Sequence, residues 1–264
     1  MLYRIGSILF SVLYWPASFT WMLVGFVATI VLRLVGVPYQ RVHMWATAPI
    51  FGGCVPLSMT RMKVHVHPDF DPEVRSVFAQ NHINLIDGHV ASRVIPHAFS
   101  GLMHAWQFKI PIYGQLMSLA KGIPVVRGRR DETLLQISEA ARNRKEIGMS
   151  VLVFPEGHRT TDGTIRNFRR GVFLMARNAG MPIVPITVRG LYEVNRKGSM
   201  VFHPGRKIDV FVGPQFSTEG LSDSELGAFV KEVRAHMLHC FEHNRWPEQA
   251  ATPEAAPIPA ASTV

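Results

Sequence analysis

The chain has 264 residues, a formal net charge of +9 and two cysteines, Cys54 and Cys240, so it is long enough for one large hydrophobic core and has no disulfide framework. Its Lys and Arg residues are dispersed through a sequence that is 47% hydrophobic, without zinc-finger spacing, a basic zipper or an aromatic RNA-binding signature. We therefore expect a protein of a reducing compartment that acts at a membrane surface and binds no nucleic acid.

The first elements in chain order are strongly apolar. About 28 uncharged residues, "IGSILFSVLYWPASFTWMLVGFVATIVL", separate Arg4 from Arg33, enough for a helix of about 42 Å against a bilayer core of about 30 Å. A break at Pro16 instead gives two short halves that enter the membrane and return as a hairpin. A cleaved signal peptide fits poorly, because the apolar region is too long and one basic residue precedes it. We expect residues 1–45 to form a membrane anchor, either such a hairpin or a single kinked span, and Arg33 and Arg41 after its apolar stretch favour a cytoplasmic exit.

The remainder alternates between strand and helix patterns, after a bridge through "MWATAPIFGG". Apolar, β-rich runs predict six strands, at "MKVHVH", "VRSVFAQ", "GIPVVRG", "SVLVFPEG", "MPIVPITVRG" and "KIDVFVG". Helical patterns lie at "DETLLQISEAARNRKEIG", "FRRGVFLMARNAG" and "LSDSELGAFVKEVRAHMLHCFEHN". This alternation predicts an α/β domain over residues 46–246, with a mixed, largely parallel sheet flanked by helices. The Ala/Pro-rich tail, residues 247–264, is predicted to be disordered.

A histidine and an aspartate stand five positions apart after the second predicted strand, in "NHINLID". Five positions separate two side chains by about 140° on a helix, so a contact between His82 and Asp87 requires the chain to bend after the strand. Neutral imidazole suits taking a proton from an alcohol, and the carboxylate would fix its tautomer. Since no G-x-S-x-G elbow is present, the substrate would supply the nucleophile. The alternative is a capping and packing pair.

Three more polar clusters follow predicted strands. In "GIPVVRGRR", Arg127, Arg129 and Arg130 match phosphate oxygens, although a solvated basic loop has the same composition. In "VLVFPEGHRTTDGT", a tight turn after the strand places Glu156 and Arg159 in one space, where arginine can hold a phosphate and glutamate a hydroxyl. The fourth cluster, "IVPITVRG", reads as a sheet edge or tunnel wall. Ligands of open α/β sheets bind beyond the carboxyl ends of the strands, so these clusters can share one site.

Together the four blocks resemble those of the glycerolipid acyltransferases, the lysophosphatidate acyltransferases and their relatives. The resemblance covers about residues 75–190, in the family's order, and implies His82 as the general base with Asp87 as its partner. The residues that it implies for substrate binding are Asn81, Arg127, Glu156, Gly157 and Arg159. Two departures leave the acceptor open, namely Asn84 in place of a small hydroxyl residue and His158 in place of Thr or Ser.

The resemblance implies a membrane-bound enzyme that moves an acyl group from a thioester to the hydroxyl of a lysophospholipid, with 1-acyl-glycerol-3-phosphate giving phosphatidate as the leading case. The expected partners are acyl-CoA or acyl carrier protein, the lysophospholipid, and the cytoplasmic face of a bacterial inner membrane, with no metal or other cofactor. Other lyso-lipid acceptors such as a lyso-ornithine lipid, a lipid hydrolase and a non-catalytic membrane-lipid binding module are the alternatives. The helical spacing of His236, His239, Cys240 and His243 is compatible with a metal site, but a packed amphipathic helix is the stronger interpretation.

Overall fold

The computed structural model describes residues 2–111, 113–126, 128 and 130–247. Arg127 and Arg129, and the predicted disorder of residues 248–264, lie outside the described residues. The helices are α1 (Leu2–Leu34), α2 (Tyr39–Val42), π-helical η1 (His43–Thr47), α3 (Ala48–Leu57), α4 (Asp87–Val94), 3-10 helical η2 (Ala105–Lys109), α5 (Tyr113–Leu119), α6 (Arg130–Glu146), α7 (Arg170–Asn178), 3-10 helical η3 (Leu191–Glu193) and α8 (Leu226–His243). The strands are β1 (Arg61–Val66), β2 (Val77–Gln80), β3 (Phe99–His104), β4 (Ile123–Val125), β5 (Ser150–Val153), β6 (Ile183–Arg189) and β7 (Lys207–Val212).

One seven-stranded sheet with the order β1-β7-β6-β2-β5-β3-β4 forms the centre of the protein. Neighbouring strands are parallel except β6 and β7, which confirms the predicted mixed, largely parallel sheet. Because β2, β4, β5 and β6 run in one direction, the segments that follow them leave the same edge of the sheet. All four sequence blocks therefore belong to that edge.

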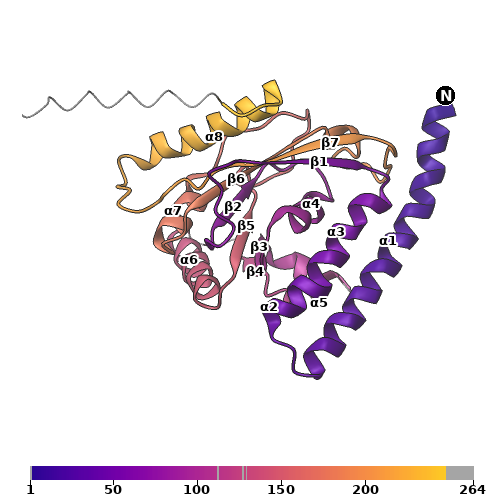
Figure 1. Cartoon of the computed structure of the whole chain (residues 1–264), viewed down its shortest axis with the longest axis horizontal. Helices are drawn as coiled ribbons and strands as arrows, with labels where there is room; N and C mark the ends of the chain where they lie inside the picture. The colour runs from indigo at the N-terminus through magenta and orange to yellow at the C-terminus, as the bar shows by residue number, and fades with distance from the viewer. Residues whose placement is uncertain (1, 112, 127, 129, 248–264) are drawn as a thin grey trace, which may run out of the picture.

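Helices cover both faces of the sheet (Figure 1). On one face, Phe78 and Leu152 of the sheet pack in a buried cluster that includes Tyr14 of α1, Val55 of α3 and Val90 of α4. On the other face, strand residues pack with residues of α6, α7 and α8, among them Ile137, Phe173 and Val233. The buried strands β2 and β5 have no exposed residue, which explains their continuous apolar runs in the sequence.

Some elements differ from the expectation. The segment "MWATAPIFGG" is helical, and not a bridge: it belongs to a continuous helical run from Tyr39 to Leu57, in which π-helical η1 precedes Pro49. A Cβ at Gly53 would lie 2.5 Å from Trp21 Nε1, so glycine here serves close packing of α3 on α1. Pro185 does not mark a sheet edge either. It lies on the interior strand β6, one residue before the pairing with β7 begins at Ile186.

The N-terminal segment is one continuous helix. Helix α1 contains Pro16 without interruption, and the chain first reverses after Leu34, so the structure has no hairpin broken at Pro16. A proline inside a helix removes one backbone hydrogen bond, which bends a helix without ending it where neighbours hold both sides. By length and composition, α1 is the one helix among the described residues that is apolar enough to cross a membrane.

Buried neutral histidines predict a stability that depends on pH. Burial lowers the pKa of His97 from 6.5 to about 4, and its Nε2 hydrogen-bonds with Ser150 Oγ. Between these pKa values the unfolded chain binds a proton that the folded protein does not, so the free energy of unfolding falls as pH falls, by at most about 1.4 kcal/mol per pH unit for this residue. Urea unfolding from pH 7 to pH 4 should show a shallower loss for His97→Gln than for the wild type. Parallel curves would contradict the prediction.

Candidate active site

His82 and Asp87 meet at the carboxyl edge of the sheet. His82 follows β2 by two residues, and its Nδ1 lies 2.6 Å from Asp87 Oδ2. The same carboxylate oxygen accepts hydrogen bonds from the backbone N–H groups of Ile83 (2.6 Å) and Asn84 (3.0 Å). The carboxylate therefore makes the predicted bend: it closes the turn after β2 and also holds the imidazole, so the capping interpretation and the catalytic one describe the same contacts.

The pair is buried on the aspartate side and open on the histidine side. The Asp87 side chain is 1% exposed and that of His82 is 23% exposed. Burial raises the pKa of Asp87, and the hydrogen bonds from His82, Ile83 and Asn84 act in the opposite direction. When Asp87 is ionised it can only accept, so Nδ1 carries a proton and Nε2, on the opposite side of the ring, is left to accept one. This is the tautomer that a general base requires.

The turn after β5 fixes His82 from three sides. The ring of Phe154 stacks on the imidazole with centroids 4.1 Å apart and an angle of 15° between the planes. The His82 N–H donates to Glu156 Oε1 at 2.8 Å, and the His82 carbonyl accepts from the Thr160 N–H at 2.8 Å. Both backbone groups of the histidine are thus satisfied, and its ring has one face covered.

Glu156 is a buried carboxylate that binds two backbone N–H groups. The side chain is 6% exposed, and its second oxygen accepts from the Arg166 N–H at 2.9 Å. Burial raises the pKa of Glu156, and the hydrogen bonds from the His82 and Arg166 N–H groups oppose that rise. Because both oxygens bind backbone donors, Glu156 positions the His82 turn, and its predicted contact with an acceptor hydroxyl stays a prediction.

Asn81 joins the end of β2 to β6. It is 1% exposed, its Nδ2 donates to the Val188 carbonyl at 2.9 Å, and the Val188 N–H donates to its Oδ1 at 2.7 Å. The amide thus replaces strand pairing between the end of β2 and β6. Asn81 therefore has a structural role, and its predicted contact with substrate stays a prediction.

Gly157 is required by the backbone. Its φ is +73°, where residues with a side chain are strained, and a Cβ would lie 2.4 Å from Arg169 Nε. The Arg169 N–H in turn donates to the Pro155 carbonyl at 2.8 Å, which holds this arginine over the turn. Gly157 therefore allows the Arg169 side chain to approach the backbone of this turn.

Three arginines, Arg159, Arg166 and Arg169, lie around the turn after β5. Of these, the sequence predicted a role for Arg159. Arg159 is half-buried, whereas Arg166 and Arg169 are exposed. Arg169 Nη2 lies 3.1 Å from Nδ1 of His158, the residue at one of the two departures from the family pattern. One signal for Arg169 was available: basic residues before and at the start of α7 oppose the helix dipole, so stability alone does not explain them.

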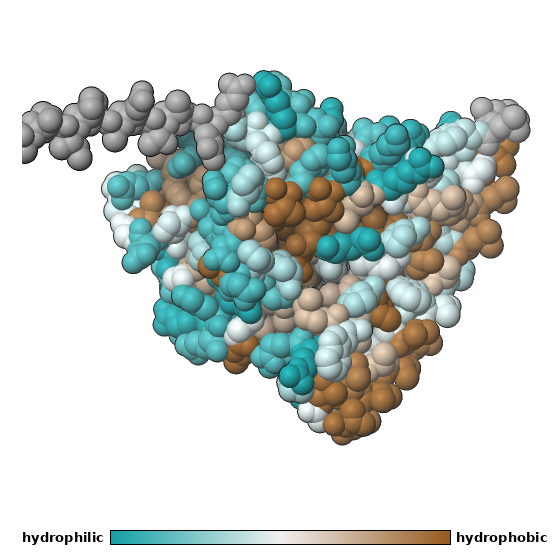
Figure 2. Space-filling model, viewed as in Figure 1, coloured by the Kyte–Doolittle hydropathy of each residue, from teal (hydrophilic) through white to brown (hydrophobic). Residues whose placement is uncertain are grey.

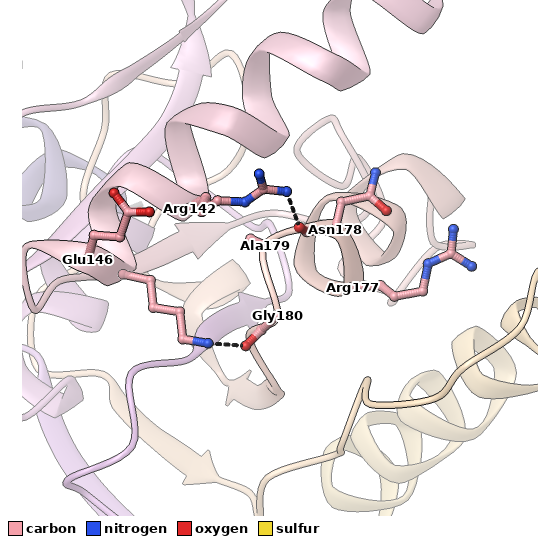
Figure 3. A pocket seen from close by; sticks show the side chains of 7 residues that line it. Arg142, Glu146, Arg177, Asn178, Ala179 and Gly180 are labelled. Atoms are coloured by element: carbon pink, nitrogen blue, oxygen red, sulfur yellow. Dashed lines mark hydrogen bonds between the residues drawn. The ribbon is translucent and has the colours of Figure 1, made fainter.

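Other candidate places do not contribute to this site. Within the described chain, no group of three or more His, Cys, Asp and Glu side chains is arranged to hold a metal ion, and His236 packs against the rings of Phe216 and Trp246. A surface hollow beside the end of α7 is lined by cations that already bind carbonyls (Figure 3). There Arg142 donates to the Asn178 carbonyl at 2.8 Å and Lys145 to that of Gly180 at 2.6 Å, so these cations cap the helix.

Comparison with known proteins places this site in a family. Residues 61–189 match the family model described as Acyltransferase. Relatives named 1-acyl-sn-glycerol-3-phosphate acyltransferase include that of Limnanthes alba, 27% identical over 205 residues (77% of this chain, 72% of the relative). That of Saccharomyces cerevisiae is 26% identical over 216 residues (81% and 70%), and the alpha form of Mus musculus is 30% identical over 186 residues (69% and 64%).

A solved structure shares the fold. The crystal structure of the 1-acyl-sn-glycerophosphate (LPA) acyltransferase PlsC from Thermotoga maritima aligns with a TM-score of 0.77 at 20% identity, over 93% of this chain and 100% of that one. The sheet, the site at its edge and these relatives define the protein as an acyltransferase. The match over residues 61–189 and these relatives confirm the resemblance to the glycerolipid acyltransferases.

Proposed function

We propose that the protein transfers a fatty acyl group from a thioester to the free hydroxyl of a lysophospholipid, with 1-acyl-sn-glycerol-3-phosphate as the acceptor and phosphatidate as the product. The observation that carries the proposal is the His82–Asp87 hydrogen bond at the same sheet edge as three arginines. The names of the relatives favour this acceptor, and an anionic head group suits the cations around the turn.

In the proposed reaction His82 Nε2 takes the proton of the acceptor hydroxyl while the oxygen attacks the thioester carbonyl carbon. The tetrahedral intermediate then expels the thiolate, the carbon–sulfur bond breaks, and the imidazolium returns the proton to the sulfur. Asp87 stabilises the imidazolium that forms between the two steps. Proton transfer contributes about 10²–10⁴-fold and positioning of the two substrates much of the remainder. The enzyme forms no covalent intermediate and uses no resident cofactor, and either acyl-CoA or acyl carrier protein is the donor.

Membrane attachment through α1 is part of the proposal. One face of this helix, with Ser7, Ser11, Tyr14, Ser18 and Met22, is buried against the protein. The opposite face is apolar and exposed along the whole helix, and in Figure 2 it forms the brown rim of the molecule. A helix held along its length on one side offers the other side to lipid, so we propose that α1 lies along the cytoplasmic face of a bacterial inner membrane and does not cross it.

A charge on the exposed face of α1 should weaken this attachment. Leu13 is 73% exposed on α1, so Leu13→Glu leaves the core intact and places a carboxylate in the lipid, which should reduce binding to phospholipid vesicles by about tenfold or more. Leu135→Glu is the matched control, because Leu135 is 62% exposed on α6, which covers the opposite face of the sheet. Vesicle flotation measures both variants, and equal binding would contradict the proposed orientation.

The function is tested by incubating purified protein with labelled acyl thioester, with and without 1-acyl-glycerol-3-phosphate in vesicles. Label in phosphatidate supports the proposal, free fatty acid identifies a hydrolase, and unchanged thioester identifies a binding protein. A panel of lyso-lipid acceptors, including a lyso-ornithine lipid, and of acyl-CoA against acyl carrier protein then defines both substrates.

Arg159 is proposed to bind the acceptor phosphate. Arg159→Ala removes a charge-assisted contact of about 1.5–3 kcal/mol and should raise the KM for the acceptor about 10- to 100-fold, with little change in the KM for the donor. Arg142→Ala is the control, since Arg142 has the same charge but caps α7 beside the surface hollow. If only the donor KM rises in Arg159→Ala, the phosphate lies elsewhere.

A further inference from the structure

The loop of residues 199–203, which follows β6, is hydrogen-bonded to and packed against helix α1. Ser11 Oγ of α1 accepts a hydrogen bond from the Phe202 N–H at 2.8 Å, and Trp15 Nε1 donates to the Met200 carbonyl at 2.9 Å. The ring of Phe202, which is fully buried, lies 4.3 Å from that of Tyr14 between centroids. The first half of α1 therefore sets the position of residues 199–203, far from it in sequence.

The same loop is held internally by one asparagine. Asn195 is fully buried, and its Nδ2 donates to the carbonyls of Ser199 (2.9 Å) and Val201 (3.1 Å). The His203 N–H closes the loop on the Val194 carbonyl at 2.8 Å. These three hydrogen bonds close residues 194–203 into a loop that is held by its own backbone and by Asn195.

Asn84 connects this loop to the His82 turn. Its Nδ2 donates to the carbonyls of Leu191 (3.0 Å) and Asn195 (3.3 Å), while its Oδ1 accepts from the Ile86 N–H at 2.9 Å. Its own N–H is one of the donors to Asp87 Oδ2. The side chain is 2% exposed, so water does not substitute for these partners.

We infer that Asn84 and Asn195 are positioning residues. Through them, the docking of α1 on residues 199–203 sets the alignment of the His82–Asp87 pair. The inference rests on the proposed function, in which α1 lies on the membrane and His82 is the base. A connected path of hydrogen bonds runs from Ser11 through Phe202 and Asn195 to Asn84, and ends on the oxygen that holds the imidazole. The site is aligned when α1 is docked on residues 199–203, which links full activity to the docked anchor.

Asn84 is one of the two residues at which this chain departs from the family pattern, where a small hydroxyl residue is common at this position. A serine at position 84 can still accept from the Ile86 N–H, but its hydroxyl is too short to reach the Leu191 and Asn195 carbonyls as well. Asn84→Ser therefore separates the turn from the loop while it keeps the local turn. Ser11→Ala separates the loop from α1 at the other end of the path.

A double-mutant cycle with Ser11→Ala and Asn84→Ser tests the coupling. Each single variant should lower kcat about 3- to 10-fold with unchanged KM values, and the double variant should be no slower than the slower single variant. Ser18→Ala is the control, because Ser18 is a buried serine on the same face of α1 and lies outside the path. Multiplied effects in the double variant would overturn the inference, as would a loss in Ser18→Ala equal to that in Ser11→Ala.

Hydrogen exchange gives a readout that does not depend on activity. The amides of Ile83 and Asn84 donate to Asp87 Oδ2, so their exchange should rise about 3- to 10-fold in Ser11→Ala and stay unchanged in Ser18→Ala. Unchanged exchange in Ser11→Ala would overturn the inference whatever the activity. If the wild type transfers no acyl group but Ser11→Ala still shows this rise, the proposed function is contradicted and the coupling is retained.

Discussion

His82→Ala is expected to lower kcat for acyl transfer by about 10²–10⁴-fold and to leave the fold and membrane binding intact. The imidazole is the group that would take the proton of the acceptor, and no other described side chain shares the Asp87 carboxylate with it. The backbone at position 82 is held by Glu156 and Thr160, which do not depend on the ring. Alanine therefore removes the base and keeps the turn.

His65→Ala is the matched control for that measurement. His65 also pairs with an aspartate, with its Nε2 2.9 Å from Asp209 Oδ1, and its side chain is 23% exposed, the same as His82. It lies on β1, which runs opposite to β2 across the sheet, so it faces no part of the site. Initial rates with labelled thioester should fall in His82→Ala and not in His65→Ala. Comparable turnover in the two variants refutes the assignment of the base.

The sequence was most informative where burial dictates residue type. All six predicted strands exist, because fully buried parallel strands require continuous apolar runs such as "VFAQ" and "SVLV". The position of the four sequence blocks at one edge of the sheet followed from the parallel direction of their strands alone. β3 was not predicted, since "FSGLMH" contains a glycine and is half exposed over most of its length, and α4 was missed because its eight residues are too few for a clear helical period.

The sequence predicts which segments form the candidate site. It predicts less well which atoms each side chain of those segments contacts. The His82–Asp87 contact follows from a local bend of five residues. In contrast, Glu156 binds an N–H ten residues onward, and Asn81 binds Val188, more than a hundred residues away. Spacing cannot show which buried backbone group a polar side chain satisfies, because that depends on packing of distant strands. The structural contacts of both side chains were therefore not visible in the sequence, and their predicted contacts with substrate stay predictions.

Asp87→Asn should lower kcat by about 10²–10⁴-fold with the histidine still in place. An asparagine oxygen can accept from Ile83 and Asn84 and keep the turn, but it carries no charge to stabilise the imidazolium that forms after proton transfer. An amide NH₂ turned toward the ring would instead select the wrong tautomer. The same transfer assay measures the loss, and a rate within threefold of wild type would show that the carboxylate only closes the turn.

The same variant separates the catalytic contribution of the carboxylate from its effect on stability. Burial raises the pKa of Asp87 in the folded protein above the ordinary 3.8 of the unfolded chain. At a pH between 3.8 and the raised pKa, the folded protein therefore holds a proton that the unfolded chain has lost. The free energy of unfolding of the wild type therefore decreases through this window as pH rises, and asparagine, which does not titrate, removes the decrease. The stability of Asp87→Asn relative to wild type should rise with pH above 3.8 in urea unfolding. If it falls instead, the three hydrogen bonds to Oδ2 outweigh burial, and the charge that the reaction needs also stabilises the fold.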